Sequence, residues 1–135
     1  MVIYIDGASR GNPGPASYGV CIEKHSGEGF LEFSEAIGLS TNNVAEYSAL
    51  IRALEEAKKL NAEDLKIYTD SQLLARQFQG LYKIKEETLK MLMAEIRGLV
   101  KNFRSVKVHH IMRSSHAGNK RADKLCNIAL NAAGF

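Results

Sequence analysis

The first forty residues carry short β-rich runs separated by turn-forming residues. Residues 2–5 are apolar and are followed by an acid, and residues 9–15 are dense in glycine, proline, serine and asparagine, which favour turns. Two further β-rich runs cover residues 16–23 and 29–37, with a hairpin connection expected at 24–28. The pattern predicts three strands that are antiparallel neighbours.

The rest of the chain alternates helical and strand-like patterns. Apolar residues at helical spacing mark residues 43–60, 71–79 and 86–103 and a last segment that begins at Asn119. Strand-like runs lie between them, at residues 65–70 and 105–112. Thr41 or Asn42 is the expected cap of the first helix. The order of elements predicts a mixed sheet covered by helices, a layered α/β (α+β) domain formed by residues 1–135.

Composition places the chain among ordinary globular proteins. Of its 135 residues 45% are hydrophobic and 24% charged, and no apolar run approaches the roughly 20 residues of a membrane span. The N-terminus lacks the features of a signal peptide, so we expect a cytoplasmic protein with no membrane contact. Cys21 and Cys126 lie far apart without a nearby Cys or His partner, which predicts buried free thiols rather than a disulfide or a zinc site.

Charge is distributed unevenly along the chain. Residues 1–70 hold six basic against eleven acidic side chains, whereas residues 97–124 hold eight basic side chains and only Asp123 as an acid. The formal net charge is +3. A basic segment beside an acidic one indicates a polyanionic ligand held next to a site that needs carboxylates, although a solvated basic face gives the same pattern.

Four acids occupy positions where they can meet. Asp6 and Asp70 each end an apolar strand, and adjacent parallel strands would place them side by side. We expect Glu46 and Asp123 in the first turns of their helices, with Glu46 at the edge of the packed surface. Clustered carboxylates repel one another unless a cation joins them, and an all-oxygen ligand set favours Mg²⁺ or Mn²⁺. Paired metal ions of this kind recur in phosphodiester cleavage.

Several short motifs occur in a characteristic order along nearly the whole chain. They are Asp6-Gly7, Gly11-Asn-Pro-Gly-Pro15, Tyr18-Gly19, Thr41-Asn-Asn-Val-Ala-Glu46, Thr69-Asp-Ser-Gln72 and Asn119-Lys-Arg-Ala-Asp123. In these motifs the chain resembles the type 1 ribonucleases H. The resemblance implies a five-stranded mixed sheet of strand order 3-2-1-4-5 flanked by helices. It also implies endonucleolytic hydrolysis of the RNA strand of RNA–DNA hybrids, leaving 5′-phosphate and 3′-hydroxyl ends.

The resemblance also implies roles for individual residues. Two Mg²⁺ ions, with Mn²⁺ as a substitute, would be held by the four acids, and His116 would assist proton transfer or product release. The residues that would contact the hybrid are Ala8, Arg10, Gly11, Asn12, Asn42, Asn43 and Gln72. The chain's other histidines, His25, His109 and His110, are expected to be structural or solvated.

The chain departs from the family pattern after the third acid, where some members carry a basic protrusion rich in Trp and Lys. Here residues 80–85 occupy that place, and the chain has no Trp. Hybrid affinity would therefore rest on Lys83, Lys85 and the basic segment 97–124, without a preceding hybrid-binding domain, and we expect weak, salt-sensitive binding by a monomer. An alternative is a catalytically weak module that binds hybrid or double-stranded RNA, and activity on duplex RNA stays open.

Overall fold

The computed structural model describes residues 1–25 and 27–135. Its elements follow in the order β1 (Val2–Ser9), β2 (Gly14–Glu23), β3 (Phe30–Ser40), α1 (Asn42–Lys59), β4 (Asp64–Thr69), α2 (Gln72–Phe78), α3 (Glu87–Val100), β5 (Ser105–His110) and α4 (Ala117–Ala132). Ser26, within the expected hairpin connection, lies outside the described residues. Every expected strand and helix is present, with shifted ends.

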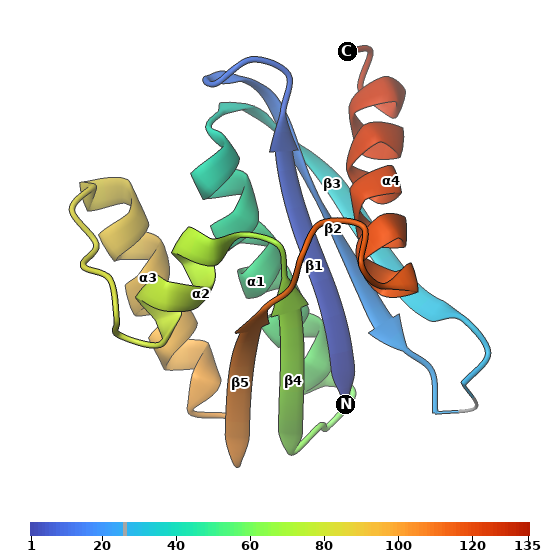
Figure 1. The fold of residues 1–135 in the computed structure, drawn as a ribbon, viewed down its shortest axis with the longest axis vertical. Coiled ribbons are helices and arrows are strands. Elements are labelled where there is room, and N and C mark those ends of the chain that lie inside the picture. The colour runs from blue at the N-terminus through green and yellow to red at the C-terminus, as the bar shows by residue number, and fades with distance from the viewer. Residues whose placement is uncertain (26) are drawn as a thin grey trace.

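The strands form one mixed sheet in the order β3-β2-β1-β4-β5. The first three strands pair as antiparallel neighbours, whereas β1 pairs with β4, and β4 with β5, in parallel. Figure 1 shows the central position of β1 and the parallel strands β4 and β5 beside it. Both the predicted mixed sheet and its strand order are confirmed.

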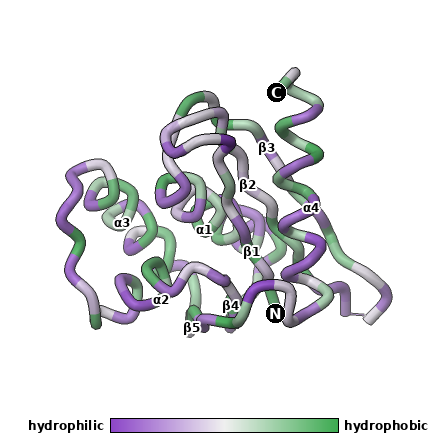
Figure 2. The backbone as a smooth tube through the Cα atoms, turned by 45° about the horizontal axis from the view of Figure 1, so that its top comes forward, coloured by the Kyte–Doolittle hydropathy of each residue, from purple (hydrophilic) through white to green (hydrophobic). Residues whose placement is uncertain are grey.

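Helices cover the two faces of the sheet unequally. On one face α1 packs against β1 and β2, and α3 packs on α1; on the other, α4 packs across β1, β2 and β3 (Figure 1). The side chains of β1 alternate accordingly: Ile3 and Ile5 are in the core beneath α1, and Tyr4 is in a smaller cluster beneath α4 with Leu125. Figure 2 shows the matching alternation of hydrophobic and hydrophilic residues along α4.

β1 is longer than its apolar run predicts. It continues through Asp6 to Ser9, because Asp6 pairs with Gly19 of β2 and the antiparallel ladder runs on to Ser9 and Ala16. The parallel ladder with β4 stops earlier, at Ile5. Asp6 therefore lies where the parallel pairing ends rather than at the end of its strand.

The helix starts differ from expectation in ways that move two of the acids. Thr41, one of the two expected caps, accepts a hydrogen bond from the Val44 amide, at 3.2 Å, so α1 begins at Asn42; α4 begins after His116 rather than at Asn119. Neither helix has an acid in its first turn, so the prediction for Glu46 and Asp123 was wrong and both lie one turn further in. Placing Glu46 at the edge was also wrong, because its side chain is buried.

The first turn of α4 packs closely on β1. A Cβ on Gly118 would lie 2.1 Å from the ring of Tyr4, so only glycine allows the first turn of α4 to pack this closely on β1. Local propensity contains no sign of this contact.

Both cysteines are placed as the sequence predicts. Cys21 and Cys126 are both free and buried, and burial raises the pKa of the Cys21 thiol to about 12. Within the described part of the chain no helix has the length and apolar character needed to cross a bilayer.

Candidate active site

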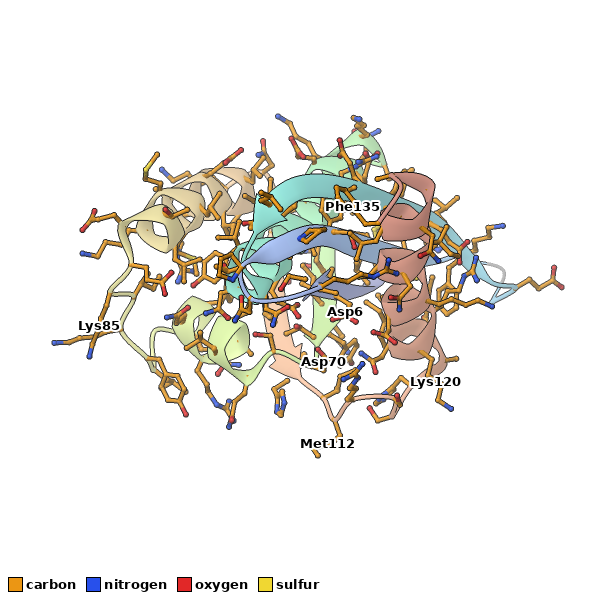
Figure 3. All side chains as sticks on the ribbon, turned by 90° about the horizontal axis from the view of Figure 1, so that it is seen from above. Asp6, Asp70, Lys85, Met112, Lys120 and Phe135 are labelled. Carbon is orange, nitrogen blue, oxygen red and sulfur yellow. The ribbon has the colours of Figure 1, made fainter. Side chains whose placement is uncertain are left out.

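Three carboxylates from separate elements meet at one end of the sheet. Ligand oxygens of Asp6, Glu46 and Asp70 all lie within 4.8 Å of one another. The parallel ladder of β1 and β4 pairs Ile5 with Thr69, and each of these residues is followed in the chain by an acid. This register places Asp6 and Asp70 side by side, as the sequence predicts, and Figure 3 shows both near the centre of this end of the molecule.

Glu46 reaches the strand acids because α1 lies directly on β1. A Cβ on Gly7 would lie 2.4 Å from both the carbonyl carbon of Ala45 and the backbone nitrogen of Glu46. Glycine at this position therefore permits backbone contact between strand and helix. The Gly7 amide also donates to Oδ1 of Asp6, at 2.9 Å.

Burial and mutual repulsion make these acids hard to ionise without a cation. Asp6 is 4% exposed, and burial, with Asp70 and Asp123 nearby, raises its pKa to about 8. Glu46 is 7% exposed, and burial followed by the charges of Asp6 and Asp70 raises its pKa well above the usual range. Within the described residues, Oε2 of Glu46 is buried without a hydrogen-bond partner. An orphaned oxygen among clustered carboxylates fits a divalent cation with oxygen ligands.

Asp123 joins the same site from its rim. An open cleft of about 530 Å³ is lined by Asp6, Gly7, Ala8, Ser9, Asn42, Asn43, Glu46, Asp70, Ser71, Arg113 and Asp123. It contains all four predicted acids. The Asp123 side chain is 37% exposed, and its Oδ1 lies 3.5 Å from a terminal guanidinium nitrogen of Arg113. Asp123 is outside the tight group of three but close enough to raise the pKa of Asp6.

Asn119 is a site residue to which the sequence analysis gave no role. It is 2% exposed, its amide nitrogen lies 3.4 Å from Oδ2 of Asp70, and its amide oxygen accepts a hydrogen bond from the Ser114 backbone. It thus ties Asp70 to the loop between β5 and α4. Its place at the start of the Asn119–Asp123 motif is the sequence signal that points to it.

His116 precedes α4 on an aromatic platform. Its ring stacks on Tyr68 with centroids 6.0 Å apart and tilts over Tyr4 at 5.9 Å, and its Nδ1 lies 2.8 Å from the Ser115 hydroxyl. It is exposed and is not among the described residues that line the cleft. A catalytic role for His116 therefore stays a prediction.

The other three histidines differ in how far they are buried. His109 is half-buried and lies against Tyr68, with ring centroids 5.5 Å apart, while His110 is half-buried and His25 exposed.

The predicted substrate residues fall into two groups. Ala8, Asn42 and Asn43 line the cleft. Asn12 supports this wall, because its side-chain oxygen accepts from the Asn42 amide at 3.0 Å, and the Asn42 side-chain oxygen accepts in turn from the Ser9 amide at 2.8 Å.

The second group is outside the cleft lining. Arg10 donates to the side-chain oxygen of Asn131, at 2.9 Å, and to the carbonyl of Phe135, so it links the β1–β2 turn to the end of the chain. Gly11 occupies the same turn with a φ of 93°. Gln72 is the exposed first residue of α2.

Comparison with known proteins agrees with this architecture. Residues 4–129 match the family described as reverse transcriptase-like. The "Bifunctional protein Rv2228c" of Mycobacterium tuberculosis is 41% identical over 134 residues, which are 98% of this chain and 36% of that protein. The "Ribonuclease H" of Legionella pneumophila strain Paris is 34% identical, over 95% of this chain and 94% of its own length.

Among solved structures, LC11-RNase H1 in complex with an RNA/DNA hybrid superposes with a TM-score of 0.89 at 43% identity, covering 98% of this chain and 97% of that one. The chain belongs to the type 1 ribonuclease H family. It spans only about a third of the M. tuberculosis relative.

Proposed function

We propose that the chain hydrolyses the RNA strand of RNA–DNA hybrids endonucleolytically. The observation that supports this most directly is the group of carboxylates in the cleft, within 4.8 Å of one another, with an unpartnered buried oxygen on Glu46. A protein that only bound nucleic acid would gain nothing from acids facing phosphates. The relative whose structure was solved with an RNA/DNA hybrid supports the choice of substrate.

Asp6, Glu46, Asp70 and Asp123 would hold two Mg²⁺ ions, or Mn²⁺ in their place. Such a pair, when bound, activates a water for in-line attack and stabilises the leaving 3′ oxygen, giving 5′-phosphate and 3′-hydroxyl ends. Asp6, buried beside Glu46 and Asp70, would be one of these ligands. The residues themselves fix the positions of the charges, and two of them, Asp6 and Glu46, are buried.

The cleft wall would hold the substrate beside the acids. Ala8, Asn42 and Asn43 lie where the minor groove would meet the protein, and contacts to the 2′-hydroxyl there would distinguish RNA from DNA. Asn12 positions Asn42, Gln72 would join Asn42 and Asn43 at base edges in the minor groove, and Arg10 and Gly11 would also meet the hybrid. His116 would exchange a proton through Nε2, since its Nδ1 contacts the Ser115 hydroxyl.

An Asp6→Asn variant tests the proposal against the alternative of a binding module. It removes one negative charge without a change of shape, so we expect loss of cleavage with hybrid affinity retained or improved. Asp64→Asn is the matched control, because Asp64 is at the far end of β4 with Arg104 as its partner. Two results would reject the assignment. One is cleavage by Asp6→Asn at the native rate, and the other is no cleavage by either the native chain or Asp64→Asn.

A further inference from the structure

Arg113 is the one cation among the described residues that line the carboxylate cleft. Its side chain is 74% exposed, and the contact with Asp123 is a single 3.5 Å approach. Other arginines near this end of the molecule are more firmly held. Arg121 donates two hydrogen bonds to Glu32, and Arg10 donates to the end of α4.

The backbone that carries Arg113 is fixed even though its side chain is not. The Ser115 amide donates to the carbonyl of Met112 at 3.1 Å, which closes a turn around Arg113. Ser114 is held in the left-handed region, with a φ of 61°, and its amide donates to the buried side chain of Asn119. The Cα of Arg113 is therefore held beside Asp70 and Asp123 while the guanidinium can move.

We propose that Arg113 binds a backbone phosphate of the nucleic acid, and that its contact with Asp123 is the resting contact of the metal-free chain. The inference rests on the proposed function. An exposed ion pair with one long contact is weak and easily exchanged. Cations bound to the acids would cancel the attraction of Asp123 for Arg113, and a guanidinium matches a phosphate in charge and in its paired donors.

The proposal predicts different effects on hybrid binding and on Mn²⁺ binding when Arg113 is replaced by Gln. Hybrid affinity, measured with Mg²⁺ in the Asp6→Asn background to prevent cleavage, should fall about threefold to tenfold. Its dependence on salt should weaken by about one unit of log–log slope. Mn²⁺ affinity, measured by calorimetry in a chain that keeps Asp6, should be unchanged or rise up to about fivefold, because no ion pair has to break.

Two further variants separate charge from position. Arg113→Lys should keep the salt slope and recover part of the affinity. Lys59→Gln removes the same charge from a side chain that is 73% exposed and paired with Glu56, at the end of α1 away from the cleft, and should leave the binding of both ligands unchanged.

Equal hybrid affinity and salt slope in Arg113→Gln and Lys59→Gln would overturn the proposal. So would weaker Mn²⁺ binding by Arg113→Gln, since Arg113 would then support the metal ligands instead of competing with the ions. Failure of the proposed function itself would appear separately, as absence of cleavage by the native chain.

Discussion

Gly7 and Glu46 are in backbone contact: a Cβ on Gly7 would lie 2.4 Å from the Glu46 nitrogen. This contact sets the distance between β1 and α1 at the site. It lets the Asp6 and Glu46 carboxylates converge although their residues belong to different layers of the fold. The absence of a side chain at one position is thus a condition for the acidic cluster.

Replacing Gly7 with Ala should therefore destabilise the protein and disturb the site. We expect the free energy of unfolding to fall by about 1–3 kcal/mol, because the backbone must move to admit the methyl group. Mn²⁺ affinity should fall as well. Urea unfolding and calorimetry measure the two effects.

Gly98→Ala is the matched control for Gly7→Ala. Gly98 lies within α3, and a Cβ there meets no atom within 4 Å. This substitution should be neutral or should stabilise the protein by up to about 1 kcal/mol, since alanine favours helix. Equal stability of the two variants would show that the contact at Gly7 does not constrain the fold.

The metal-free protein should lose stability as pH rises. The pKa of Asp6 is raised from 3.8 to about 8, and that of Glu46 is raised in the same direction. The folded chain therefore binds more protons than the unfolded chain between about pH 4 and pH 8, so its stability falls across this range. Urea midpoints in chelator at pH 5, 6, 7 and 8 would show the decline.

Asp6→Asn should make that decline shallower, because it removes one of the two buried acids. A saturating divalent cation should abolish it, because the cation favours the ionised carboxylates. Stability that rises from pH 5 to pH 8 without metal would contradict the electrostatic account of the site.

Removing the Asn119 side chain should release the loop that it ties to Asp70. Asn119→Ala deprives the Ser114 amide of its acceptor, so we expect a loss of about 1–3 kcal/mol and slower cleavage. Asn102→Ala, which removes an exposed contact with the Leu99 carbonyl, should change stability far less. Thermal unfolding and a cleavage assay test this, and equal effects would deny Asn119 its positioning role.

Cleavage at low substrate concentration should depend steeply on salt. Lys83 and Lys85 are exposed, and Figure 3 shows Lys85 far to one side of Asp6 and Asp70. Phosphate contacts made by such exposed side chains are screened by salt. With two or more phosphate contacts, the rate should drop about tenfold or more between 50 and 200 mM salt. A rate that stays constant over this range would refute weak, mainly electrostatic binding.

The sequence predicts the elements because they depend on local patterns, and it places Asp6 beside Asp70 on the condition that their strands are adjacent and parallel. Apolar periodicity marks the helices, and the acids follow apolar runs on strands that turn out to be parallel neighbours. The burial of Glu46 could not be predicted in this way, because it depends on how closely α1 approaches Gly7.

The same limit explains the other differences. Gly118 lies against the ring of Tyr4, and Asn119 is turned inward to Asp70 and Ser114. Arg113 appeared in the sequence only as one member of a basic segment. Its place in the cleft depends on a tertiary turn that no spacing reveals.

The most direct test offers the purified chain three strand-labelled duplexes: an RNA–DNA hybrid, duplex RNA and duplex DNA. Each is incubated with Mg²⁺, with Mn²⁺ and with chelator. The account predicts cuts within the RNA strand of the hybrid, ending in 5′-phosphates, and no cuts in chelator. An intact hybrid under every metal condition, with the chain still bound to it, would contradict the assignment and leave the buried acids at Asp6 and Glu46 without a function.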